Sequence, residues 1–99
     1  MQEENRIPAN EVCAYHNIEI GFIYSLQEYG LVEITGDDEE ALIATDQLSE
    51  LEKFICLHYE LNINLEGIDV IQHLLKKLEA TQQEMTSLRN QLKFYRNNS

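Results

Sequence analysis

Apolar residues recur along most of this chain at the three- and four-residue spacing of a helix with one buried face. The segments with this spacing are residues 8–16, 19–29, 47–61 and 65–95. The residues expected on their buried faces include Val12, Cys13, Ile23, Leu26 and Leu61, with Tyr15 or His16 as a further inward position of the first helix. Pro8 suits a first helical turn, and Gly30 is typical of a helix end. Asp46 and Asn64 are candidate N-terminal caps of the third and fourth helices. The pattern predicts two short helices joined by a tight connection at 17–19, then a third helix and a long last one.

The period changes between the second and third predicted helices. Residues 31–34 (Leu-Val-Glu-Ile) and 41–44 (Ala-Leu-Ile-Ala) are short runs compatible with β-structure. The polar stretch 35–40, Thr-Gly-Asp-Asp-Glu-Glu, separates them. Two such runs around a polar, glycine-containing loop predict a β-hairpin with an acidic tip.

The last predicted helix contains a heptad pattern of apolar residues. Its members are Ile71, Leu74, Leu78, Thr81, Met85, Leu88, Leu92 and Tyr95. Alternating spacings of three and four are typical of a coiled-coil stripe, and Thr81 is the polar interruption. Beyond Glu79 no chain segment is left over to cover the stripe, so we expect it to pack against a second copy. The spacing alone does not decide the orientation of the pair. The expected organisation is a domain over 1–64, a dimerisation helix over 65–96 as part of one structural unit, and a disordered tail over 97–99.

Charge is distributed unevenly between these parts. Residues 1–75 contain 16 acidic and two basic residues, a net charge of −14, whereas residues 76–99 contain two acidic and five basic ones. Nucleic-acid binding requires lysine and arginine to neutralise phosphates. A globular part at −14 is instead complementary to a basic protein surface. Acidity can also serve solubility alone, and the run at 37–40 can be a solvated turn.

The cysteines and histidines are the candidates for a disulfide, a metal site or catalysis. Cys13 and Cys56 lie among apolar neighbours, which favours free buried thiols over a disulfide framework. Cys13 with His16 and Cys56 with His58 could supply four zinc ligands, but their spacing is unlike that of structural zinc sites. We expect no enzyme activity, no catalytic residue, no metal and no cofactor. The sequence shows neither a signal peptide nor an apolar span, so we expect a cytoplasmic protein without membrane contact.

The order helix, tight turn, helix, acidic hairpin, helix and long C-terminal helix resembles the winged helix-turn-helix domain of the MerR type. The segment 24–32, ending in Tyr-Gly-Leu-Val, resembles that family's passage from the second helix to the wing. The resemblance implies a mainly α fold with a small β-hairpin wing and a coiled-coil-type last helix. DNA-binding members carry arginine in the second helix and in the wing. Here the second helix has Glu19 and Glu28, no basic residue and only Gln27 as a base reader.

More narrowly, residues 7–95 resemble the CbpM-type chaperone modulators. The matching features are Glu11-Val12-Cys13, the segment 29–33, the hairpin, and the segment 61–68 before the heptad helix. This resemblance implies an adaptor that binds the basic J-domain of a DnaJ-like co-chaperone and modulates its action on Hsp70. The alternatives are a MerR-type DNA-binding transcription regulator and a dimerisation module with an unrelated partner.

Two sets of site residues follow. The residues expected to bind the partner are Glu11, Glu19, Glu28, Asp37, Asp38, Glu39 and Glu40. The residues expected to form the homodimer are Leu78, Met85, Leu88, Leu92 and Tyr95. By analogy with the MerR family, the two long helices would pair antiparallel.

Overall fold

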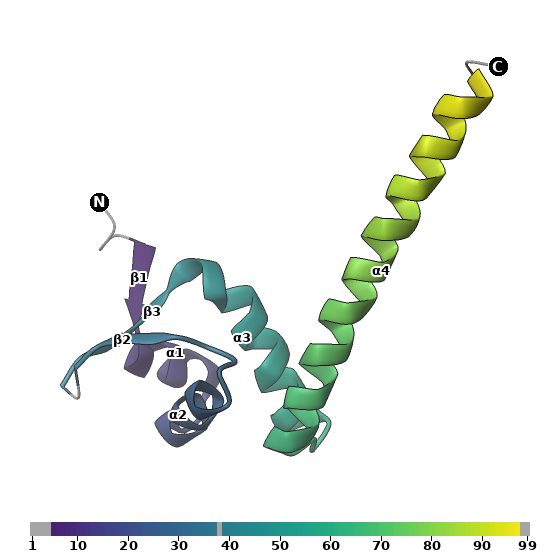
Figure 1. Cartoon of the computed structure of the whole chain (residues 1–99). Coiled ribbons are helices and arrows are strands. Elements are labelled where there is room, and N and C mark those ends of the chain that lie inside the picture. Colours follow the sequence, from purple (N-terminus) through teal and green to yellow (C-terminus); the bar gives the residue numbers. More distant parts are fainter. Residues whose placement is uncertain (1–4, 38, 98–99) are drawn as a thin grey trace. The chain divides into compact units, whose positions relative to one another are not determined.

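The computed structural model describes residues 5–37 and 39–97 and is mainly helical (Figure 1). In chain order its helices and strands are β1 (Arg6–Pro8), α1 (Ala9–His16), α2 (Ile20–Glu28), β2 (Ile34–Gly36), β3 (Ala41–Ala44), α3 (Leu48–Ile55) and α4 (Leu65–Asn97). The chain divides into two compact units, residues 1–69 and 70–99. The first unit contains the sheet, the three short helices and the start of α4. The second is the remainder of that helix.

Each helix of the helix-turn-helix is followed by a residue with left-handed backbone. Asn17 ends α1 at φ 58°, and the backbone N–H of Ile18 donates to the carbonyl of Cys13 at 3.0 Å. Gly30 follows α2 at φ 75°, and the N–H of Leu31 donates to the carbonyl of Leu26 at 2.9 Å. Both arrangements satisfy helix-end carbonyls that would otherwise lack partners. They confirm the predicted connection at 17–19 and the predicted helix end at Gly30.

The wing differs from the predicted hairpin. Its first strand was expected at 31–34 but is β2 at Ile34–Gly36. Leu31 instead belongs to the turn that ends α2 and packs against the core. Val32 is buried in the core instead of lying in a strand. The wing is also a three-stranded antiparallel sheet in the order β1-β3-β2. The prediction from sequence placed Pro8 in the first helix and did not include strand β1.

The three strands meet across a row of isoleucines. Ile43 in the central strand pairs with Ile7 of β1 and with Ile34 of β2. Ile43 is completely buried, and its two neighbours pack against the core. Residues paired across adjacent strands project from the same face, so this row attaches the sheet to the helices.

The third helix is shorter than predicted. Residues 47–61 were expected to be helical, whereas α3 ends at Ile55 and is followed by one π-helical turn, Cys56–Glu60. The wider turn changes the side-chain phase, and Leu61, expected on the buried face, is exposed. Asp46 lies within a 3₁₀ turn, Thr45–Gln47, and no side-chain cap bonds the start of α3. The expectation that Asp46 caps this helix was therefore wrong.

The core of the first unit is made by residues from α1, α2, the loop after α2, β3, α3 and the start of α4. The buried hydrophobic residues are Ala9, Val12, Cys13, Phe22, Ile23, Leu26, Val32, Ile43, Leu51, Phe54, Ile55 and Ile68. Burying each large side chain contributes about 1.5–3 kcal/mol before the entropy cost of folding. The predicted inward positions Val12, Cys13, Ile23 and Leu26 are confirmed, whereas Tyr15 of α1 is 84% exposed.

Helix α4 begins as predicted and runs slightly further. The Asn64 side-chain oxygen accepts a hydrogen bond from the N–H of Gly67 at 2.8 Å, which confirms the predicted cap. The helix continues to Asn97, two residues past the expected end at Tyr95. Every residue from Lys76 to Asn97 is exposed. Residues 98–99 of the expected tail lie outside the described residues.

Gly36 in the wing and Gly21 in α2 together allow a stability prediction. Gly36 has φ 89°, and a Cβ there would collide with the backbone oxygen of Glu40. We expect Gly36→Ala to lower the free energy of unfolding by about 1–3 kcal/mol. Gly21, in α2, has nothing within 4 Å of its Cβ position. Gly21→Ala is therefore the matched control and should stabilise the chain by up to about 1 kcal/mol. Urea denaturation followed by circular dichroism measures both, and equal effects of the two changes would contradict this account of the wing.

Candidate protein-interaction surfaces

The tip of the wing is organised by one aspartate. The Asp37 Oδ1 atom accepts the backbone N–H groups of Glu39 at 3.0 Å and Glu40 at 2.8 Å. This is an Asx-type turn, in which a side chain replaces a backbone acceptor. Asp37, Glu39 and Glu40 are all exposed. The turn therefore brings three of the expected partner-binding residues together, while Asp38 lies outside the described residues.

The root of the wing is held by three side-chain hydrogen bonds. The backbone N–H of Glu33 donates to Gln47 Oε1 at 2.8 Å, and Gln47 Nε2 donates back to the Glu33 carbonyl at 2.9 Å. This reciprocal pair ties the loop after α2 to the turn before α3. On the other side, the Arg6 guanidinium donates to the Thr35 hydroxyl at 3.0 Å, which links β1 to β2.

The second helix of the helix-turn-helix presents no cation. Helix α2 contains neither lysine nor arginine. Its only candidate base reader, Gln27, directs its amide nitrogen to the Ile34 carbonyl at a long 3.5 Å. The two basic residues in residues 1–75 are also engaged, Arg6 with Thr35 and Lys53 with Glu50 at 3.4 Å. The lysine and arginine side chains with which a DNA reader neutralises phosphates are therefore lacking from α2.

The remaining expected partner-binding residues do not form one patch with the wing tip. Glu19 immediately precedes α2 and Glu28 is its last residue, so they lie at opposite ends of a helix about 13 Å long. Glu11 is exposed in the first turn of α1. There it lines a cleft of about 430 Å³ formed by β1, α1 and α3.

Of the residues that line this cleft, only Glu11 was among the predicted partner-binding residues. Its lining residues are Ile7, Glu11, Val12, Ala14, Tyr15, His16, Leu48 and Glu52. Tyr15 was expected to be a possible inward residue of the first helix, but its side chain is exposed and lines the cleft. The partners of Tyr15 across the cleft come from about 35 residues further along the chain, and helical spacing alone could not place them there.

Comparison with known families identifies the fold. The family model described as MerR HTH family regulatory protein matches residues 7–90. The chain belongs to this family. The same comparisons find no significant match among curated proteins or solved structures. Membership assigns the chain to a family of regulatory proteins, and the helix-turn-helix, the wing and the long helix are the corresponding parts of this MerR-like chain.

The second unit of this MerR-like chain exposes its heptad stripe. Leu78, Met85, Leu88, Leu92 and Tyr95 are each between 52% and 72% exposed. The hydroxyl of Thr81 donates to the Lys77 carbonyl of its own helix at 2.9 Å. Because that hydroxyl is already satisfied, a threonine at this stripe position leaves no polar donor for a partner to accommodate.

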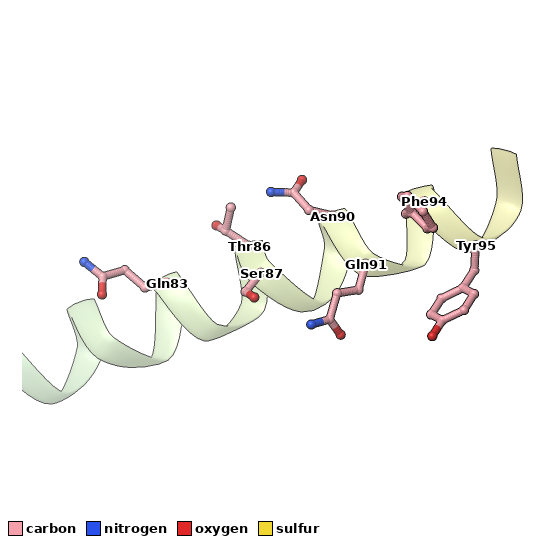
Figure 2. A pocket seen from close by; sticks show the side chains of 7 residues that line it. All are labelled: Gln83, Thr86, Ser87, Asn90, Gln91, Phe94 and Tyr95. Carbon is pink, nitrogen blue, oxygen red and sulfur yellow. The ribbon is translucent and has the colours of Figure 1, made fainter. Parts of the chain in front are cut away.

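The hollow along the C-terminal part of α4 has only one wall. Figure 2 shows its seven lining side chains, all carried by this helix: Gln83, Thr86, Ser87, Asn90, Gln91, Phe94 and Tyr95. Gln83, Thr86 and Asn90 project to one side of the helix, and Gln91 and Tyr95 to the other. Small-molecule sites enclose most of their ligand, which a single helix surface does not do.

The cysteines and histidines form no evident reactive site in the described part of the chain. Burial raises the pKa of the Cys13 thiol, which keeps it protonated and weakly nucleophilic. Cys56 is half-buried. His58 stacks on Phe22 at a centroid distance of 4.7 Å, and its Nδ1 lies 2.9 Å from the Ile63 carbonyl, an acceptor that requires the proton on Nδ1. Within 5–37 and 39–97, no three His, Cys, Asp or Glu side chains gather as metal ligands.

None of the helices within the described ranges is both long and apolar enough to cross a membrane.

Proposed function

We propose that this chain is a non-catalytic adaptor that binds the basic J-domain of a DnaJ-like co-chaperone and modulates its action on Hsp70. The J-domain is the partner that the resemblance to the CbpM-type chaperone modulators implies, and the observation that supports a basic partner is the charge of the helix-turn-helix part. Residues 1–75 have a net charge of −14, and α2 presents no lysine or arginine. A MerR-like frame with this surface is electrostatically complementary to a basic protein domain. Occupation of the J-domain would compete with Hsp70 for the same surface.

The second candidate is a DNA-binding transcription regulator, and membership of the MerR HTH family favours it. Such a regulator grips the backbone with several cations and reads base edges from the second helix. Arg6 and Lys53 are the only arginine and lysine before position 76. Residues 76–99 contain five basic and two acidic residues, and the net charge of that segment is only +3. The balance of charge therefore favours the protein partner.

The adaptor would act as a homodimer through the stripe on α4. Five exposed large apolar residues follow one another at heptad spacing from Leu78 to Tyr95. A stripe of this kind is stable in water when a second helix covers it, and it invites aggregation when nothing does. In a two-fold symmetric pair each of these contacts is made twice. Lys77 and Arg89, among the basic residues on this helix, would then lie near the acidic first unit of the partner copy or in solvent.

The partner proposal predicts a salt-dependent complex. The immobilised chain should retain a purified DnaJ-like co-chaperone through its J-domain. Raising salt from about 0.05 to 0.5 M should weaken the affinity by about tenfold or more, because the screening length falls well below 10 Å. Titration at both salt concentrations measures this. An affinity that is unchanged or higher at 0.5 M would reject the electrostatic account, and no retention at low salt would reject this partner.

The wing tip should contribute to the rate of encounter. The triple variant Asp37→Asn, Glu39→Gln, Glu40→Gln removes three charges, while the amide oxygen of the new asparagine can still accept the two turn hydrogen bonds. We expect association with the co-chaperone to slow by about threefold to tenfold, with the thermal midpoint unchanged. The control Asp46→Asn, Glu60→Gln, Glu66→Gln removes three exposed charges elsewhere. Stopped-flow mixing measures the association rate of each triple variant. Equal slowing by the wing variant and by the control variant would show that net charge, and not the wing, guides the encounter.

The dimer prediction concerns two leucines of the stripe. Leu88→Glu with Leu92→Glu should convert a dimer into a monomer, since each buried leucine stabilises the pair by about 1.5–3 kcal/mol and occurs in both copies. Gln83→Glu with Asn90→Glu adds the same two charges on the side of the helix away from Tyr95 (Figure 2) and should leave the dimer intact. Analytical ultracentrifugation at micromolar concentration measures both variants. A monomeric wild type, or a dimeric leucine variant, would disprove the stripe as the dimer interface.

A further inference from the structure

The cleft between β1, α1 and α3 has an apolar floor within the first unit. Val12 is only 3% exposed, and Ile7 and Leu48 are partly buried against the same core. Ala14 lines the cleft from an exposed position of α1, where its small side chain leaves the entrance open. With a volume of about 430 Å³, the cleft can hold one or two bulky apolar side chains of a ligand.

Tyr15 lies at the edge of this cleft with 84% of its surface exposed. Its ring makes a T-shaped contact with the neighbouring His16 at 5.0 Å. An exposed tyrosine beside an apolar depression is a common feature of protein interfaces, because its ring supplies rigid apolar area and its hydroxyl tolerates water.

The charged groups of the cleft are acidic and come from both helices. Glu11 lies on α1 and Glu52 on α3, and both are exposed. His16 Nε2 lies 3.7 Å from Glu52 Oε2. Among the described residues, the lining contains neither lysine nor arginine. An occupant with positive charges beside its apolar side chain is therefore electrostatically complementary to the cleft.

The strand at the edge of the cleft is unsuitable for adding a further strand. β1 has three residues, and Pro8 among them has no N–H to donate. The other walls are two helices, which form a groove of the kind that receives the apolar face of an amphipathic helix.

We propose that this cleft is the anchor site for a basic amphipathic helix of the partner protein. One bulky apolar side chain of that helix enters between Val12, Tyr15 and Leu48. Lysine or arginine residues one turn to either side pair with Glu11 and Glu52. The inference rests on the proposed function in that it assumes a basic protein partner, and it assigns the apolar centre of the interface, which the acidic wing does not provide.

The test uses the full chain and a fluorescein-labelled synthetic peptide. The peptide has about 15 residues of alanine and lysine around one central leucine, and a companion peptide has serine in place of that leucine. Fluorescence anisotropy at low salt measures both affinities. We expect the leucine peptide to bind about tenfold more tightly than the serine peptide, a difference typical of one buried apolar side chain.

Two variants locate the binding. Ala14→Arg should block the entrance and weaken binding of the leucine peptide about tenfold, whereas Ser49→Arg makes the same charge change at an exposed α3 position outside the lining and should weaken it less than threefold. Both positions are exposed, and the circular dichroism melts of the two variants should match that of the wild type. Equal affinity for the two peptides, or equal binding by the two variants, overturns the proposal.

These measurements separate the cleft from the identity of the partner. If the peptide binds as expected while the DnaJ-like co-chaperone is not retained, the cleft proposal stands and the co-chaperone proposal fails. If the co-chaperone is retained equally by wild type and by Ala14→Arg, and the two peptides bind alike, the cleft proposal fails and the adaptor proposal stands.

Discussion

The first unit has to hold a large excess of negative charge around a small apolar core. Sixteen acidic residues face only two basic ones before position 76, and like charges on a compact surface repel one another. Its turns are accordingly secured by neutral or backbone-directed groups. Asn17 closes the turn after α1, Asn64 caps α4, and Gln47 holds the loop at Glu33. Even the acidic Asp37 directs its carboxylate to two backbone N–H groups.

The same constraint explains how a MerR-like fold can keep its architecture without the surface of a DNA reader. The fold depends on the row of Ile7, Ile43 and Ile34 and on the buried faces of α1, α2 and α3. None of these positions needs a charge. The sign of the charge at exposed positions can therefore differ without disturbing the helix-turn-helix or the wing. The fold class is thus a guide to architecture, and the surface chemistry has to decide the ligand.

The long helix follows a different physical rule from the first unit. Its polar and apolar residues alternate at heptad spacing, and the described residues from Lys76 onward are all exposed. In the first unit the buried faces of α1, α2 and α3 share one core with β3. We therefore expect a second copy of the chain to cover the stripe on α4. Thr81 is compatible with such packing, because its hydroxyl donates to a carbonyl of its own helix.

Local patterns predicted the helices of this chain well and its non-local features poorly. The turn at Asn17, the helix end at Gly30 and the cap at Asn64 depend on neighbouring residues and were readable from sequence. Strand β1 was missed because it has three residues, includes Pro8 and exists only by pairing with β3. The π-turn after Ile55 has no strong local signal, and it displaced Leu61 from the expected face. The acidic residues Glu11, Asp37, Glu39 and Glu40 are exposed. The cleft combines Tyr15 with Leu48 and Glu52, which only the folded chain brings together.

We propose that this acidic winged helix binds protein and not nucleic acid. The most direct measurement titrates one preparation of the full chain, at about 0.05 M salt, into two fluorescent probes in parallel. One probe is the J-domain of a DnaJ-like co-chaperone, and the other is a duplex of about 30 base pairs, long enough for two half-sites. The account predicts a saturable rise in anisotropy for the J-domain and none for the duplex. Saturable binding of the duplex, with no response from the J-domain, would contradict it.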